Sequence, residues 1–381
     1  MAQPIPKKIQ KNQPNLNEKT FNTLLIDGSN LLELSFRGYK KLNSQGKEIG
    51  GIFQFLLQLK ILLQKGNFRY VYCMWDGDNS GNLKFALNPS YKANRDKHFD
   101  EECLSDYMKE VNQKIKSMYK YFKNSKPSKT EDEKELFHWQ RNILIECLEE
   151  LCVRQCLCEY IEADDFIGYY VSHKKPNEKI VIVSNDRDLT QLISEDVIVY
   201  IQSIHKFINT KNHIEEMGYH HENVVLKKVL CGDVSDNIKG IKGFGEKTLY
   251  DNFSEFKTRK MSLNEIIEKA KLINEERIKL KKKPLKWAEN IINKVTDGVQ
   301  GEDIYEINEK IINLKKPLMT QEAIELIDSI MYAPLDTEDR TMTNLYKIIL
   351  KYGIDDLKDE TTFSNFFIEY KYLIDKEKKN L

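Results

Sequence analysis

The sequence of 381 residues lacks the apolar runs that a membrane protein needs, and it carries no net charge. Its most apolar stretch, IFQFLLQLKILL, is interrupted by Gln and Lys and is shorter than the roughly 20 residues that cross a bilayer. The first 20 residues contain no apolar core of signal-peptide length, and their Pro, Asn, Gln and Lys content predicts a disordered tail. We therefore expect a soluble, intracellular protein of the cytoplasm, or of the host cytoplasm if a virus encodes it.

Lys plus Arg and Asp plus Glu each number 59, so the overall charge gives no indication of a nucleic-acid partner. Any such indication has to come from where the charges lie. The seven cysteines are irregularly spaced and odd in number, which fits neither a disulfide framework nor a paired zinc motif. This usage is typical of a reducing compartment.

Three short apolar runs are rich in β-branched or aromatic residues and predict buried strands: TLLID at 23–27, YVYCMWD at 70–76 and KIVIVSND at 179–186. Between the first two, the segment GIFQFLLQLKILLQKG repeats apolar residues every three or four positions, as an amphipathic helix does. A strand, helix and strand in this order predict the α/β class, with a mostly parallel central sheet and helices on both faces.

Composition divides the chain into four regions. We expect a tail at 1–20, an α/β core at 21–225 that includes a polar, helical stretch at about 84–135 (the arch segment), a short Gly-containing motif at 226–255, and a helical, Lys-rich region at 256–381. No internal repeat is visible.

Each of the three predicted strands ends in an aspartate: Asp27, Asp76 and Asp186. In an open parallel sheet, ligands bind at the carboxyl ends of the strands, so these carboxylates should meet in one crevice. More acidic residues follow in the motif EADD (Glu162, Asp164 and Asp165) and at Asp188, two residues after Asp186.

An aspartate at the start of a helix is common and usually only caps it. Six or more carboxylates in one cleft are different, because they would repel one another, and the same motifs contain no comparable supply of Lys or Arg. Ligands that are all oxygen favour Mg²⁺ or Mn²⁺ over zinc, and two such ions about 4 Å apart can support phosphodiester cleavage. The sequence therefore predicts a site for two Mg²⁺ or Mn²⁺ ions.

The segment CGDVSDNIKGIKGFGEKTLYDNF contains two close glycines, Gly243 and Gly245, between short helical patterns. Small residues in such a turn let backbone N–H groups approach a phosphate. GIKGFGEKT is one residue too long before its Lys for a Walker A loop, and GIKGFG does not follow a strand, as a dinucleotide fingerprint would. A helix-hairpin-helix that binds the DNA backbone is favoured, and Asp233 and Asp236 just before it would add carboxylates to the metal site.

Taken in order, the motifs LLIDGSN, WDGDNSG with SYKANR, EADD, SNDRDLTQL and GDVSDNIKGIKGFGEKT resemble those of the 5′-nuclease superfamily. This superfamily includes the nuclease domain of bacterial DNA polymerase I, the flap endonucleases and the phage enzymes called RNase H. The resemblance runs from about Leu24 to Phe253. The helical region after it is more weakly similar to the phage branch.

The resemblance implies a role for particular residues. A first metal cluster would comprise Asp27, Asp76, Glu162, Asp164 and Asp186. The second metal would be held by Asp188 and Asp233, with Asp236 and Asp165 in support. Base stacking and phosphate contact at the foot of the arch would fall to Tyr91, Lys92 and Arg95. The helix-hairpin-helix would include Gly243, Gly245 and Lys247, together with a monovalent cation such as K⁺.

In one respect the chain departs from the family pattern. Many relatives have an arginine seven residues before the tyrosine, where this chain has Lys84. A lysine keeps the charge but lacks the planar fork of arginine, so we expect looser phosphate positioning there.

As a function, the resemblance implies a Mg²⁺-dependent 5′→3′ exonuclease and flap endonuclease that cleaves near 5′ ends of DNA and RNA·DNA hybrids, including RNA primers and flaps in replication. Its partners would be DNA with 5′ flaps, nicks or ends, and a single-strand-binding protein or a sliding clamp. The segment FSNFF lacks the Gln of a clamp-binding peptide and fits a packed aromatic helix face better. A catalytically inactive DNA binder and a PIN-type ribonuclease are the alternatives. The intact acidic set disfavours the first, and the helix-hairpin-helix and arch segments disfavour the second.

Overall fold

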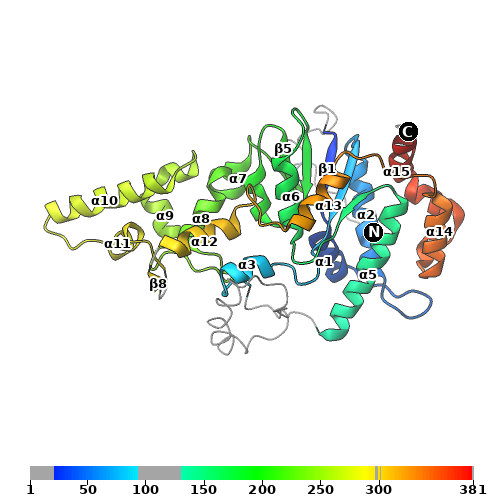
Figure 1. Ribbon diagram of the computed structural model, residues 1–381, viewed down its shortest axis with the longest axis horizontal. Coiled ribbons are helices and arrows are strands. Elements are labelled where there is room, and N and C mark those ends of the chain that lie inside the picture. Colours follow the sequence, from blue (N-terminus) through cyan, green and yellow to red (C-terminus); the bar gives the residue numbers. More distant parts are fainter. Residues whose placement is uncertain (1–20, 93–129, 297–298, 301, 380–381) are drawn as a thin grey trace.

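We describe the fold from a computed structural model, which describes residues 21–92, 130–296, 299–300 and 302–379. The predicted tail at 1–20, most of the predicted arch, and Arg95 lie outside these residues. In Figure 1 the molecule is elongated, with a sheet and its covering helices at one end and an arm of helices at the other. No helix in the described ranges is long and apolar enough to cross a membrane.

A six-stranded sheet forms the centre of the fold, with strand order β3-β2-β1-β4-β5-β6. The first five strands run parallel and β6 pairs antiparallel with β5 at one edge. The strands are β1 (Thr23–Asp27), β2 (Tyr70–Met74), β3 (Arg154–Cys156), β4 (Ile180–Val183), β5 (Val197–Ile201) and β6 (Lys206–Ile208). The three runs that the sequence marked as strands are β1, β2 and β4, which lie side by side, as a shared carboxyl edge requires.

Helices cover both faces of this sheet, which confirms the predicted α/β class (Figure 1). One face packs against α1 (Gly28–Gly38), α2 (Gly50–Leu63), α5 (Glu131–Glu150), α14 (Met342–Lys351) and α15 (Glu360–Lys379). The other face packs against α6 (Ala163–Ser172) and α13 (Gln321–Ile330). Strands β1, β4 and β5 are buried on both faces, which is why they are almost entirely apolar instead of alternating.

A third apolar core lies in the helical arm, outside the sheet. It is built by α8 (Val224–Cys231), α9 (Glu246–Asn252), α10 (Leu263–Lys279), α11 (Lys286–Ile292) and α12 (Glu302–Ile312). The remaining elements are short: α3 (Asn82–Leu87), α7 (His213–Met217), β7 (Val295–Thr296), β8 (Val299–Gln300), and the 3₁₀ turns η2 (Arg187–Leu192), η3 (Gln202–Ile204), η4 (His221–Asn223), η5 (Ser254–Lys257) and η6 (Asp355–Leu357).

The region expected as one helical unit at 256–381 is shared among all three cores. Helices α10, α11 and α12 complete the arm, and α13 packs on the same face of the sheet as α6. Helices α14 and α15 pack against α2 and α5 on the other face. Phe363, Phe366 and Phe367 of the FSNFF segment are buried there. They form a packed aromatic face, as the sequence favoured, and in this arrangement they are not available to a clamp.

A buried ion pair fastens α15 to the edge of the sheet. The guanidinium of Arg154 in β3 donates to both carboxylate oxygens of Glu377, at 2.9 and 3.1 Å, and to the carbonyl of Ala333 at 2.8 Å. Both side chains are almost fully buried. Removing one partner of such a pair leaves the other charge buried without a counter-ion, which is strongly destabilising.

We therefore predict that Arg154→Ala lowers the free energy of unfolding by about 3–5 kcal/mol, measured by urea denaturation. Lys271→Ala, which breaks the exposed pair with Glu268, is the control and should cost less than about 1 kcal/mol. Replacing both partners, as Arg154→Met with Glu377→Leu, should recover most of the loss. Equal losses for Arg154→Ala and Lys271→Ala would contradict the role of the buried pair.

Candidate active site

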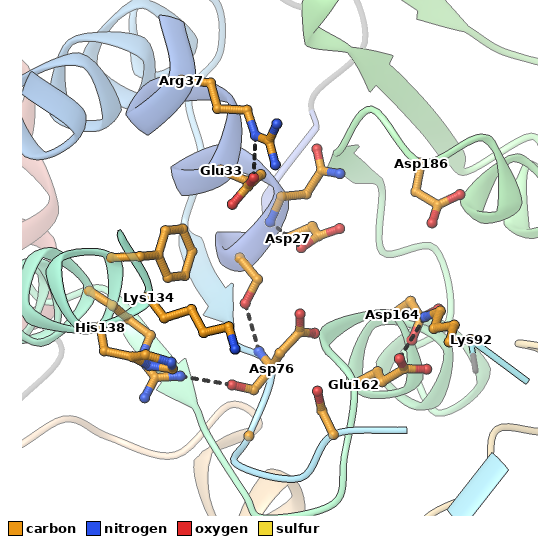
Figure 2. Close-up of a pocket in the computed structure, with 16 residues that line it drawn as sticks. Asp27, Glu33, Arg37, Asp76, Lys92, Lys134, His138, Glu162, Asp164 and Asp186 are labelled. Carbon is orange, nitrogen blue, oxygen red and sulfur yellow. Dashed lines mark hydrogen bonds and ion pairs between the residues drawn. The ribbon is translucent and has the colours of Figure 1, made fainter. Parts of the chain in front are cut away.

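A cleft of about 560 Å³ opens at the carboxyl edge of the sheet. Asp27 ends β1, Asp76 follows β2 by two residues, and Asp186 follows β4 by three. Glu162 and Asp164, at the start of α6, line the same cleft. Figure 2 shows the five carboxylates around one space. The residues assigned to the first metal cluster are therefore brought together.

Hydrogen bonds fix the directions of these carboxylates. Asp27 caps α1 by accepting from the N–H of Asn30 at 3.0 Å, and its other oxygen accepts from the hydroxyl of Ser184 at 2.8 Å. Asp76 accepts from the N–H of Ala163 at 2.8 Å, which joins the end of β2 to the start of α6. Asp27 and Asp76 are therefore oriented by backbone and hydroxyl donors of the protein itself.

A second acidic group lies beside the first. Asp188, Asp233 and Asp236 each offer an oxygen within 4.8 Å of the others. Asp188 comes from η2 and the other two from the loop after α8, so this group joins the sheet to the arm. Asp233 also accepts from the N–H and hydroxyl of Ser235, at 2.8 and 2.6 Å.

Three lysines lie among the carboxylates, which corrects the expectation that the acidic set lacks neighbouring cations. Lys84 contacts Glu162 at 2.8 Å and Asp165 at 3.0 Å. Lys92 contacts Glu162 at 2.6 Å. The third, Lys228, pairs with both Asp188 and Asp233. Lys84 and Lys92 were expected to contact phosphate, whereas the structure pairs them with carboxylates, and α8 brings in Lys228 from another part of the chain. Nine carboxylates still outnumber three ammonium groups.

Comparison with known proteins agrees with this geometry. The profile of a family described as "5′-3′ exonuclease, N-terminal resolvase-like domain" matches residues 22–218, more than half of the chain. The chain belongs to the 5′-3′ exonuclease family.

The relatives of this exonuclease are distant in sequence, but their alignments cover most of its chain. The 5′-3′ exonuclease of Buchnera aphidicola subsp. Acyrthosiphon pisum is 27% identical over 271 residues, which are 70% of this chain and 78% of the relative. The 5′-3′ exonuclease of Bacillus subtilis is 28% identical over 247 residues, 62% of this chain and 70% of the relative. The solved structure of T5 5′-exonuclease with bound divalent metal ions (zinc) has a TM-score of 0.52 at 16% identity, covering 93% of this chain and 99% of its own, and shows a shared fold.

Burial, and after it mutual repulsion, raises the pKa values of several carboxyl groups in the cleft. Burial, and then the charge of Asp76, holds the pKa of Asp27 well above its usual range. Burial and Asp186 raise the pKa of Asp188 to about 7, although Lys228 opposes the shift. Asp233 shares that lysine but shifts the other way: burial would raise its pKa, and Lys228 with the Ser235 hydrogen bonds outweighs burial and lowers it to about 2. Asp188 differs because it is more deeply buried and faces a second carboxylate.

Of the residues expected to contact phosphate or bases, one lines the cleft and two are buried. Lys92 lines the cleft, but Lys84 is only 2% exposed and lies beneath the carboxylates instead of among solvent-facing groups. Asp165 lies there with it and is also buried. Tyr91 is 2% exposed, and its hydroxyl donates to Glu162 at 2.8 Å, so its ring is not presented for stacking. The hydrogen bonds from Lys84 and Tyr91 position Glu162 within the cleft.

Gly243 and Gly245 are exposed in the turn that joins α8 to α9, and Lys247 is exposed in the first turn of α9. Gly243 has a φ of +74°, which favours glycine, and a Cβ at either glycine would meet nothing within 4 Å. The backbone of the turn is therefore open to an approaching group.

The cleft also has a basic wall that the sequence did not reveal. Arg37, Lys134, His138 and Arg141, from α1 and α5, line it (Figure 2). Arg141 donates to the carbonyl of Asp76 at 3.1 Å. In the sequence these residues look like the polar positions of ordinary helices, and only the packing of α5 beside α1 turns them to the cleft. Lys228 was missed in the same way, and its only sequence signal is its place five residues before Asp233.

The raised pKa of Asp188 gives a prediction about stability in EDTA. Between about pH 4, where the unfolded carboxyl titrates, and about pH 7, the folded protein holds a proton that the unfolded chain has released. Raising the pH through this window therefore favours unfolding, by on the order of 1.4 kcal/mol for each unit of pKa difference.

Wild type should accordingly lose stability relative to Asp188→Asn as the pH rises from 4 to 7. Urea denaturation at several pH values measures this difference, in which the titration of the histidines cancels. Asp251→Asn, on the exposed side of α9, should run parallel to wild type. A constant gap between wild type and Asp188→Asn at every pH would show that Asp188 titrates normally.

Proposed function

We propose that the protein hydrolyses phosphodiester bonds near the 5′ ends of DNA, as a divalent-metal-dependent 5′→3′ exonuclease and flap endonuclease. The observation that carries this proposal is the meeting of two acidic groups at the carboxyl edge of the sheet in a chain of the 5′-3′ exonuclease family. The fold it shares with a T5 flap endonuclease solved with DNA and metal ions supports the same reading.

The donors in the cleft fit two Mg²⁺ or Mn²⁺ ions. Every candidate ligand is a carboxylate oxygen. Burial, and after it neighbouring carboxylates, raises the pKa values of Asp27, Asp76 and Asp186, and a divalent cation would offset the cost of holding these groups ionised in the cleft. Asp27, Asp76, Glu162, Asp164 and Asp186 would hold one ion, and Asp188, Asp233 and Asp236 the other. When bound, such ions activate the attacking water and stabilise the leaving oxygen.

The protein's own side chains then bind and orient the substrate. Lys92 reaches the cleft from the edge of the proposed arch, and its charge is suited to stabilising the phosphoryl oxygens during cleavage. Burial would lower the pKa of Lys92, but Glu162 and Asp236 outweigh burial and raise it, so the side chain stays charged at neutral pH. Lys134, His138 and Arg141 on the opposite wall would contact the phosphates that flank the scissile bond.

The duplex side of the junction would bind to the exposed α8–α9 turn. Gly243 and Gly245 let backbone N–H groups approach a phosphate, Lys247 adds charge, and a K⁺ ion would complete this helix-hairpin-helix. We propose 5′ flaps, nicks and ends of DNA as substrates, and RNA·DNA hybrids, hence primer removal, as a second class. A sliding clamp or a single-strand-binding protein would recruit the enzyme.

The test uses 5′-labelled flap, nicked duplex and RNA·DNA substrates, each with Mg²⁺ or with EDTA. We expect cleavage near the 5′ end with Mg²⁺ and none with EDTA. Asp27→Asn and Asp186→Asn should each abolish cleavage while leaving DNA affinity within a few-fold, because the carboxylates act on the transition state and affinity comes mainly from phosphate contacts.

Asp375→Asn is the matched control, since this aspartate is exposed on α15, away from the cleft. It should keep full activity. Normal turnover by a folded Asp27→Asn or Asp186→Asn protein would exclude the metal assignment, and cleavage of hybrids alone would restrict the function to RNA removal.

Lys92 should act on the rate of cleavage more than on binding. Lys92→Ala should slow single-turnover cleavage by on the order of 10²-fold, because it removes a preorganised charge aimed at the reacting phosphate. The dissociation constant, measured in Ca²⁺ so that the substrate stays intact, should rise only slightly, since one phosphate contact among several is lost.

Lys247→Ala provides the reverse case. Lys247 is exposed in the first turn of α9, away from the reacting phosphate, so its loss should weaken binding and leave the rate at saturation unchanged. If Lys92→Ala behaves like Lys247→Ala, Lys92 is a docking residue.

A further inference from the structure

A cluster of three histidines lies apart from the acidic cleft, where the sheet meets the helical arm. His213 begins α7, and His220 and His221 lie at the start of η4, just before α8. Their ring centroids are 4.6–4.9 Å apart. Each ring offers a nitrogen, and these nitrogens lie within 4.8 Å of one another.

The hydrogen bonding of His213 is that of a metal ligand. Its Nδ1 lies 3.3 Å from the carbonyl oxygen of Asn209, which can only accept, so the proton is on Nδ1 and Nε2 carries a lone pair. Histidines that bind metals commonly donate their other N–H to such a carbonyl. His213 is 4% exposed, and its Nε2 has no hydrogen-bond partner in the described part of the chain.

His221 repeats this feature. It is 7% exposed, and its Nδ1 also has no partner among the described residues. The third ring, His220, is half-buried, and its Nδ1 accepts a hydrogen bond from the N–H of Glu222. This hydrogen bond is long, at 3.3 Å, so a metal ion that binds the lone pair of Nδ1 would displace the N–H of Glu222. A buried nitrogen without a hydrogen-bond partner destabilises the fold, and His213 and His221 each contain one.

A cluster of packed aromatic rings is the competing explanation. Edge-to-face packing accounts for the ring angles of 83° and 85° around His213. It does not account for the two buried nitrogens without partners, because phenyl rings could pack in the same way without burying polar atoms. Burial, and then His213 and His220, lowers the pKa of His221 to about 4, so the ring is neutral at pH 7 and its lone pair is free to bind.

We propose that His213, His220 and His221 form a site for a transition-metal ion of the zinc type, with a solvent molecule as the fourth ligand on the exposed side of His220. Imidazole nitrogens favour zinc and its neighbours over Mg²⁺, so this site and the carboxylate cleft select different ions. In a tetrahedral site the nitrogens lie about 2.0–2.1 Å from the metal, so the rings turn inward by about 1 Å when the ion binds.

The position of the site assigns it a structural role. Asn223, two residues after His221, caps α8, and its side-chain amide donates to the carbonyls of Phe256 and Arg259. The helix it starts carries Lys228 and leads to Asp233. A metal held by α7 and η4 would therefore fasten the arm, and with it the second acidic group, to the sheet. This inference does not rest on the proposed nuclease activity.

The experiment uses the untagged full-length protein, stripped of metal and then titrated with Co²⁺ in excess Mg²⁺. Co²⁺ bound by three imidazoles in a tetrahedral site gives intense visible absorption, whereas Co²⁺ among carboxylates gives only weak bands. We expect about one equivalent of intensely absorbing Co²⁺, displaced by Zn²⁺, and a rise in melting temperature when Zn²⁺ is added.

His213→Gln and His221→Gln should each weaken binding by more than about 100-fold, since loss of an outer partner alone costs 10–100-fold. His220→Gln is half-exposed and should fold even if the buried variants do not, and it should show the same loss. His173→Gln, an exposed histidine, and Asp186→Asn, in the cleft, should keep the absorption. Absence of the intense band in wild type, its survival in His220→Gln, or its loss in Asp186→Asn would overturn the proposal.

Discussion

Repulsion among carboxylates at one edge of the sheet is the constraint on which the rest of the structure depends. Parallel strands end at the same edge, so aspartates that follow them are brought together without any attraction between them. The fold compensates with Lys84, Lys92 and Lys228, each from a different segment. Each lysine also fastens its segment to the cleft, so the same ion pairs neutralise charge and hold the site together.

This compensation is incomplete, and the incompleteness has a use. A cleft with balanced charge would bind divalent cations more weakly, whereas one without any lysine would be hard to fold in their absence. In the proposed mechanism, Lys84, buried below Glu162 and Asp165, would stay in place when ions bind, and Lys92, on the solvent side, would turn from carboxylate to phosphate.

Much of this could be predicted from the sequence, because the strands that carry the acidic residues are short, apolar and end in Asp. TLLID and KIVIVSND gave β1, β4 and the shared edge. Strand β3 was missed because RQC has only three residues and no apolar pattern, and its place depends on Arg154 pairing with the distant Glu377. The burial of Lys84 and Tyr91 was missed for a related reason: both carry polar atoms, and only the carboxylates of α6 make their burial favourable.

Two anchors flank residues 93–129. The N–H of Lys92 donates to the carbonyl of Asp236 at 2.8 Å, and on the other side Thr130 and Glu133 form a reciprocal cap at the start of α5. Both attachment points are therefore held by contacts outside the segment. Doubling the length of a flexible connection costs only about 0.6 kcal/mol in closure entropy. A change in the length of the chain between these two anchors would thus cost little and would leave the carboxylates of the cleft in place.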